Sequence, residues 1–231
     1  MVEINDFNSF VATQTTCNLI AYQYQLSSSF FHIMKINHSY FFTNCKEKHL
    51  SEVKHWITTT FSIPLLSNEI LIQTEDASDH PDEERVVKVD VLDANHCPGA
   101  CLFLFTIFQV TNLSKPFYIT LYTGDFRYSP FLLQNSFLQP FVRPHSSRFD
   151  LIYVDNTYGN KAISFPTQDI VIHTLISTLQ KYWGTHLNKA PYKVCICIGC
   201  YNIGKEKVWL EVAKAFHHKV YLSEYKMNES N

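Results

Sequence analysis

Two loops near the middle of the chain carry the residue types best suited to chemistry. The first, Asp93–Ala100, reads DANHCPGA and contains His96; the second, Tyr122–Arg127, reads YTGDFR and contains Asp125. Imidazole and carboxylate groups are common ligands of Zn²⁺, and two neighbouring loops could bring them to one ion. The alternative is a loop histidine bonded to backbone carbonyls and an aspartate in an Asx turn. Spacing alone leaves both interpretations open.

Each of these loops follows a segment that reads as a β-strand. Val86–Leu92 is β-branched and partly alternating, which predicts a strand with one face toward water. Cys101–Phe108 is apolar at nearly every position, which is typical of a strand buried on both faces. A third strand is predicted at Tyr118–Thr123. Functional residues are often found on loops that a rigid sheet positions in this way.

Other elements predicted before the first loop are weak strands at Leu19–Tyr24 and Phe30–Ile36, a short buried strand at Tyr40–Thr43 and a helix starting within Leu50–Ile57. After the second loop we predict a buried strand at Leu151–Val154, a helix capped by Thr167 with the stripe Ile172, Leu175, Ile176 and Leu179, a strand at Lys193–Ile198 and a helix with Val208, Val212 and Phe216 on one face. Strands that alternate with helices indicate an α/β fold.

Composition excludes several classes of protein. With 231 residues, 46% hydrophobic and 17% charged, the chain is globular and long enough for one large or two small domains. A net charge of −2 gives the chain no overall positive field that would attract nucleic acid. A local basic groove on such a chain could still bind nucleic acid. The longest apolar run, about nine residues, is too short to cross a membrane. Because no signal peptide opens the chain, we expect a reducing compartment and free thiols.

Three cysteines lie close together in the sequence, in the pattern Cys195-x-Cys197-x-x-Cys200. The pattern could suggest a thiolate metal site. Buried thiols in a strand are the favoured alternative, since a closed zinc site would still lack a fourth ligand.

A second candidate site lies at Asn202–Lys207, where Gly204 precedes a predicted helix with Lys205 and Lys207 near its start. Free backbone N–H groups and a cation could hold a phosphate there. Lysine in the first turn opposes the helix dipole and therefore needs a compensating anion. An ordinary helix start with solvated lysines is the alternative.

Together with Tyr153–Tyr158 (YVDNTY) and Ile203–Val208 (IGKEKV), the two loops resemble the DNA-repair metallo-β-lactamase family with a β-CASP insertion. The resemblance is strongest to its interstrand cross-link repair 5′-to-3′ exonuclease branch, which has Artemis and Apollo as relatives. It implies a partial metallo-β-lactamase αββα sandwich that runs into the start of a β-CASP domain. Residues 1–158 would be the N-terminal part of the lactamase-like domain, with 1–85 divergent, and 159–231 an incomplete start of the β-CASP-like region.

The same resemblance implies roles for individual residues. His96 would be a zinc ligand, Asp125 the carboxylate that bridges or flanks the metal, and Asp155 an acidic residue that supports the catalytic site. The metal would generate hydroxide and polarise the scissile phosphate. The 5′-phosphorylated end of DNA, which could carry a cross-link, would then be held by Asn202, Gly204, Lys205 and Lys207. The place of action would be the nucleus.

The chain departs from the family in its second motif, His-x-His-x-Asp-His. Aligned from Tyr40–Thr43, this motif falls on Asn44, Lys46, Lys48 and His49, of which only His49 fits. Lysine offers no free lone pair at neutral pH and repels a dication. The metal candidates are therefore His49, His96 and Asp125, which is the ligand count of one open catalytic zinc site rather than two.

Two functions follow from the resemblance. The first is a zinc-assisted 5′-to-3′ exodeoxyribonuclease of interstrand cross-link and double-strand-break repair, weakened or inactive in this chain. The second is a non-catalytic relative that binds DNA or a repair partner. The resemblance ends before the later β-CASP motifs, so the sequence is interpreted as a fragment, a truncated product or a degenerate paralogue. We expect no membrane association.

Overall fold

A computed structural model of the chain describes residues 10–24, 31–62, 71–73, 84–142, 144, 147–159, 164–184, 195–201 and 203–223. The chain divides into two compact units, Met1–Asp155 and Asn156–Asn231.

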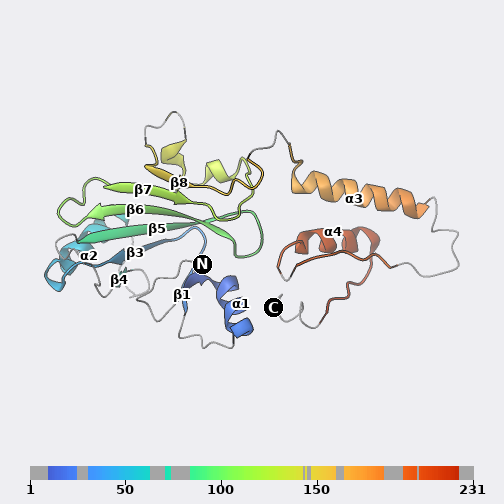
Figure 1. Ribbon diagram of the computed structural model, residues 1–231, viewed down its shortest axis with the longest axis horizontal. Helices are drawn as coiled ribbons and strands as arrows, with labels where there is room; N and C mark the ends of the chain where they lie inside the picture. The colour runs from blue at the N-terminus through green and yellow to red at the C-terminus, as the bar shows by residue number, and fades with distance from the viewer. Residues whose placement is uncertain are drawn as a thin grey trace. The chain divides into compact units, whose positions relative to one another are not determined.

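The first unit is built on a six-stranded sheet with the strand order β4-β3-β5-β6-β7-β8 (Figure 1). Its elements are β1 (Phe10–Thr13), α1 (Gln14–Tyr24), β2 (Phe31–Met34), β3 (Ser39–Thr43), α2 (Glu47–Phe61), β4 (Leu71–Gln73), β5 (Arg85–Asp93), β6 (Cys101–Gln109), β7 (Tyr118–Tyr122), the 3-10 turns η2 (Leu132–Gln134) and η3 (Gln139–Phe141), and β8 (Leu151–Tyr153). The neighbours β3, β5, β6 and β7 are antiparallel, whereas β4 and β8 each run parallel to the strand beside them. Strands β1 and β2 form a separate parallel pair. The mixed α/β class is thus confirmed.

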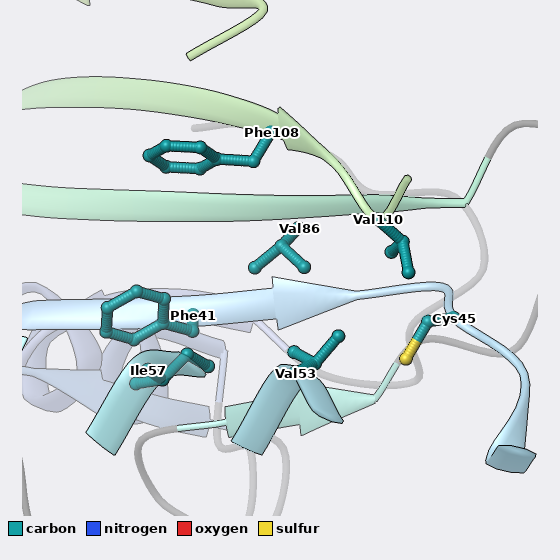
Figure 2. Close-up of a cluster of buried hydrophobic side chains, with 7 residues drawn as sticks. All are labelled: Phe41, Cys45, Val53, Ile57, Val86, Phe108 and Val110. Carbon is teal, nitrogen blue, oxygen red and sulfur yellow. The ribbon is translucent and has the colours of Figure 1, made fainter. Parts of the chain in front are cut away.

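One face of the sheet is covered in part by α2. Val53 and Ile57 of this helix point toward Phe41 of β3, Val86 of β5 and Phe108 of β6 (Figure 2). The two helix residues are four positions apart and therefore lie on one side of α2. Apolar side chains at alternate strand positions meet that side, and their burial fixes which face of β5 points toward the helix.

The same face continues into a second apolar cluster, which holds the strands next to the candidate loops. Its buried members are Leu92, Ala94, Leu102, Leu104, Leu121 and Leu138. A buried ion pair lies on this face of β5: Lys88 Nζ is 2.5 Å from Asp90 Oδ2, and Ser39 donates a hydrogen bond to the same carboxylate. The opposite face packs Met34 and Tyr40 against Val89 and Val91.

The strands predicted around the two loops are confirmed, but the prediction that Val86–Leu92 has one face toward water is wrong, because Val89 and Val91 are buried on the face opposite Val86. Val86–Leu92 lies within β5, Cys101–Phe108 within β6 and Tyr118–Tyr122 is β7. Strand β6 is buried mainly on one face, with half-buried side chains on the other, so the prediction of full burial on both faces is wrong.

Two other predictions for the first unit are also wrong. Leu19–Tyr24 belongs to helix α1, where the Gln14 side chain bonds to Asn18 one turn later. The segment Leu151–Val154 is exposed rather than buried, because β8 is the last strand of the sheet and only β7 pairs with it.

The second unit contains the helices α3 (Gln168–Tyr182) and α4 (Glu206–Phe216), which run alongside each other (Figure 1). As predicted, the Thr167 side chain caps α3 by accepting a hydrogen bond from Ile170 N at 3.4 Å. The predicted strand at Lys193–Ile198 is wrong for its described part, since residues 195–198 have no strand pairing.

The structure describes all seven cysteines and places each of them outside any disulfide bond. Among the helices that the structure describes, none combines the length and apolarity needed to cross a membrane.

Candidate functional site

The loop that carries His96 is held by its own backbone. Asp93 Oδ1 accepts a hydrogen bond from Asn95 N at 2.7 Å, which forms an Asx turn at the end of β5. Asn95 adopts a positive φ of 52°, a conformation that asparagine tolerates well. The N–H of Ala94 then bonds to the carbonyl of Ala100 at 3.1 Å and closes the loop. The position of His96 is therefore fixed by short-range bonds.

Gly99 allows this loop to approach the N-terminal segment closely. Its φ is +82°, and a Cβ atom placed there would lie 2.8 Å from Thr15 Cβ. The hydroxyl of Thr13 donates a hydrogen bond to the Gly99 carbonyl at 2.9 Å. The loop needs glycine here both for its backbone conformation and for space.

The loop that carries Asp125 is fixed by Thr123, which is buried. Thr123 N donates to the Tyr153 carbonyl at 3.0 Å, and Thr123 Oγ1 accepts from Asp155 N at 3.1 Å. Because β7 and β8 are parallel, these bonds hold the segments of Asp125 and Asp155 next to each other at the ends of both strands. This role of Thr123 was not predicted, because in the sequence it is only a polar residue at the end of a predicted strand.

His96 and Asp125 come together on the two loops. His96 Nε2 lies 3.9 Å from Asp125 Oδ2, and the two side chains are 45% and 78% exposed. Zinc forms bonds of about 2.0–2.2 Å to nitrogen and oxygen, so one ion can reach both atoms only when they are within roughly 4 Å. A small side-chain rotation would bring the pair to tetrahedral spacing.

His49 lies at the other end of β5. Its Nδ1 atom is 2.7 Å from Glu84 Oε2, and Glu84 directly precedes the first residue of this nine-residue strand. His96 lies three residues beyond Asp93, the last residue of β5, so the two histidines lie near opposite ends of a strand roughly 26 Å long. The structure therefore does not bring His49 to His96 and Asp125.

The other positions of the second motif make structural bonds. Asn44 Oδ1 accepts from Arg85 N at 2.6 Å, and Lys46 N donates to Glu84 Oε2 at 3.2 Å. Burial tends to raise the pKa of Glu84, but the bonds from His49 and Lys46 outweigh it, so the pKa lies below its usual value. Nothing in the sequence alone indicated this role of Glu84.

The donor set near His96 is incomplete for a catalytic zinc ion. Open catalytic zinc sites have three protein ligands, whereas His96 and Asp125 supply two. Within the described part of the chain, no group of three or more His, Cys, Asp or Glu side chains is placed to hold a metal ion. The pair fits part of a zinc site and not the whole of one.

The predicted phosphate site at the start of α4 makes bonds within the second unit. Gly204 N donates to Glu206 Oε1 at 2.9 Å, and Lys207 Nζ pairs with Asp169 Oδ1 of α3 at 2.5 Å. Lys205 Nζ donates to the Gly199 carbonyl at 3.1 Å. Asn202 lies outside the described residues. Glu206 and Asp169 thus provide the anions that the helix dipole argument requires.

The chain was compared with known proteins. No protein-family model matches it. It is 34% identical to the human DNA cross-link repair 1A protein over 197 residues, which cover 81% of this chain and 17% of that protein. It is 31% identical to the DNA cross-link repair protein SNM1 of Arabidopsis thaliana over 193 residues, or 79% of this chain and 36% of the relative. The 5′ exonuclease Apollo of Danio rerio matches over 128 residues at 31% identity, covering 55% of this chain and 19% of the relative.

These relatives share one ancestry with the chain over most of its length. The chain spans 17% to 36% of the lengths of the relatives matched over most of it. The chain therefore belongs to the DNA cross-link repair family of SNM1-type proteins, which also includes Apollo.

Proposed function

We propose that this chain is a DNA-repair protein of the zinc-assisted 5′-to-3′ exodeoxyribonuclease type, which serves interstrand cross-link and double-strand-break repair. Its own nuclease activity is weakened or absent. The observation that supports it most is the 3.9 Å approach of His96 Nε2 to Asp125 Oδ2, on two loops bonded to each other. The finer fold proposal is a partial metallo-β-lactamase αββα sandwich that continues into the start of a β-CASP domain.

The chain's own residues would have distinct roles. In a nuclease of this kind zinc supplies an activated water and polarises the phosphate. His96 would offer Nε2 to the ion and Asp125 one carboxylate oxygen, while the main-chain bonds between the loops set their spacing. Asp155 would support the site from the neighbouring strand end, and Gly204, Lys205, Lys207 and Asn202 would hold the 5′-phosphate of the DNA. The place of action would be the nucleus.

The proposed weakness has a structural basis. The ligand that remains from the second motif, His49, is bonded to Glu84 at the other end of β5. Lys46 and Lys48 are exposed and positively charged where the family motif has metal ligands. Loss of ligands reduces metal affinity steeply, so we expect at most one weakly held ion.

The test is cleavage of 5′-phosphorylated single-stranded DNA by the purified chain with Zn²⁺, together with its metal content by mass spectrometry. His96→Ala and Asp125→Asn should each abolish any ladder of shortened products and lower the bound zinc. His173→Ala, at an exposed histidine on α3, is the matched control and should change neither. Cleavage that survives both site variants would overturn the proposal.

A second candidate function is a non-catalytic relative that binds DNA or a repair partner. It is favoured by the two-residue donor set at His96 and Asp125, which falls short of a catalytic zinc site. Fluorescence anisotropy with the same labelled DNA separates the two candidates. Binding without cleavage, and without zinc in the unmodified chain, would select the non-catalytic function.

A further inference from the structure

The segment of residues 195–200, which precedes α4, carries three exposed thiols, those of Cys195, Cys197 and Cys200. The prediction that such thiols are buried in a strand is therefore wrong. The alternative of a thiolate metal site is not supported either, because within the described ranges no group of three or more His, Cys, Asp or Glu side chains is placed to hold an ion. What these thiols can do chemically depends on how they lie relative to one another.

Two of the three thiols lie together. The Sγ atoms of Cys195 and Cys197 are 4.0 Å apart and form a thiol–thiol hydrogen bond. In the described structure Cys200 makes no bond of this kind with either of them. The sequence pattern alone favours a different pair, since Cys197 and Cys200 have the spacing of the Cys-x-x-Cys redox motif. The structure thus pairs the cysteines differently from the pattern.

A disulfide bond between Cys195 and Cys197 would need only local movement. A disulfide has an S–S length of about 2.05 Å and Cα atoms roughly 4.4–6.8 Å apart. Cα atoms two residues apart are separated by at most about 7 Å, so the pair is close to this range in any backbone conformation. In the described structure residues 195–198 have no strand pairing that would fix their backbone. Rotation of the two exposed side chains can therefore bring the sulfur atoms to bonding distance.

The pair is open to small molecules through a groove of about 590 Å³ in the second unit. Cys195 and Cys197 line this groove together with apolar side chains of α4, Val212 and Phe216 among them. The volume lies in the range of pockets that hold small ligands. A disulfide of low molecular weight can therefore reach both sulfur atoms.

We propose that Cys195 and Cys197 form a redox-active dithiol, which a small-molecule disulfide such as oxidised glutathione converts into an intramolecular disulfide bond. The Cys197 thiolate attacks one sulfur of the oxidant, and the first reduced thiol leaves. The Cys195 thiolate then attacks Cys197 Sγ, which breaks the mixed disulfide and releases the second thiol. Two protein thiols are thereby oxidised, one disulfide is reduced to two thiols, and the two cysteine protons end on the released thiols.

The contact between the two sulfur atoms sets the order of attack. The hydrogen bond to Cys197, followed by the negative charge of its thiolate, raises the pKa of Cys195. Cys195 therefore keeps its proton while Cys197 is the thiolate, and the thiolate is the nucleophile. Once Cys197 is part of the mixed disulfide, its charge is gone and Cys195 can lose its proton. In a reducing compartment the dithiol is the resting form, and the disulfide forms when the surrounding thiol pool becomes oxidised.

The test uses the full reduced chain in glutathione buffers of fixed redox ratio at pH 8. After an acid quench, mass spectrometry follows the tryptic peptide of residues 194–205, which contains all three cysteines. In the parent chain this peptide should lose two hydrogen atoms, and Cys200→Ser should do so at the same redox ratio. Cys195→Ser is the matched comparison, because it keeps the Cys-x-x-Cys pair. It should need a buffer at least about tenfold more oxidising.

Several outcomes would overturn the proposal. If Cys195→Ser forms a disulfide at the same redox ratio as the parent chain, Cys197 and Cys200 are the redox pair. If the parent chain yields only mixed disulfides with glutathione, or dimers on a non-reducing gel, no intramolecular bond forms. Because these thiols are exposed, serine at their positions should leave the circular dichroism spectrum unchanged, so a change in oxidation reports the thiols themselves.

The same titration in urea tests the contribution of the fold. Unfolding removes the observed approach of the two sulfur atoms, so half-oxidation should need a redox ratio at least about tenfold more oxidising. An unchanged ratio would overturn the structural basis of the proposal, because sequence spacing alone would then set the pairing. None of these results depends on binding or cleavage of DNA, so failure of the dithiol proposal and failure of the nuclease proposal are distinguishable.

Discussion

Arg127 donates its backbone N–H to the carbonyl of Ala94 at 2.9 Å, and this bond joins the two candidate loops directly. Asn95 Nδ2 adds a longer contact of 3.4 Å to the Arg127 carbonyl. Both bonds end on main-chain atoms of Arg127. The spacing of His96 and Asp125 therefore depends on the backbone conformation of the two loops, and these bonds do not involve the Arg127 side chain.

The buried hydroxyl of Thr123 should be important for stability at this site. Thr123→Val removes the acceptor of the Asp155 N–H and the donor to the Gly124 carbonyl, so we expect a loss of about 1–3 kcal/mol in the free energy of unfolding. Thr120→Val is the matched control, since its buried Oγ1 has no hydrogen-bond partner, and it should be neutral or stabilising. Urea denaturation of both variants measures the difference, and equal costs would contradict this account.

Substitution of Gly99 should disturb the His96 loop. Gly99→Ala places a methyl group at a φ of +82° and 2.8 Å from Thr15 Cβ, so we expect a cost of about 1–3 kcal/mol. Gly184→Ala is the control, because beyond its own chain neighbours and helix backbone no atom of the described residues lies within 4 Å of the added Cβ. Thermal unfolding should show a lower Tm for Gly99→Ala alone. A Tm unchanged from that of the parent chain would argue against the close approach.

Alkylation rates should separate the buried cysteines from the exposed ones. Burial, with a smaller effect of the Asp93 carboxylate, raises the pKa of Cys101 to about 11. A raised pKa means less thiolate at pH 8, by about a hundredfold relative to an ordinary thiol. Iodoacetamide at pH 8, followed by peptide mass spectrometry, should label Cys200 early and Cys101 late, as it should the buried Cys17 and Cys45. Early labelling of Cys101 in the folded chain would contradict its burial.

Removal of Asp169 tests whether Lys207 can contact DNA. Asp169→Asn frees the Lys207 ammonium group and, as both side chains are largely exposed, should change stability by less than about 1 kcal/mol. If Lys207 belongs to a phosphate site, affinity for 5′-phosphorylated DNA should rise and its salt dependence should steepen. Glu211→Gln frees Lys214 on the same helix in the same way and is the control. Equal responses of the two variants in fluorescence anisotropy would indicate general charge rather than a site.

The central strands and the loops that carry His96 and Asp125 were predictable because their signals are local. A β-branched or apolar run that ends at a loop rich in Gly, Pro or Asp predicts both a strand and the residue at which the strand ends. Helix α3 was predictable for the same reason, with Thr167 as its cap. These elements need no knowledge of distant partners.

Burial and long-range pairing were not predictable in this way. Leu151–Val154 is as apolar as a buried strand. It is nevertheless exposed, because β8 is the last strand in the order of the sheet. The neighbourhood of His49 is decided by Glu84, 35 residues away. The roles of His49, Asp155 and the α4 residues stay predictions, as does the assignment of residues 1–158 and 159–231 to two domains.

The direction of β5 determines where new metal ligands at the second-motif positions would lie. Histidines introduced at Lys46 and Lys48 would be added beside Glu84, one full strand away from His96. Such imidazoles would therefore form a separate cluster around Glu84 and would not enlarge the His96–Asp125 pair. Additional ligands for that pair would have to come from residues at the other end of β5, where the two loops meet.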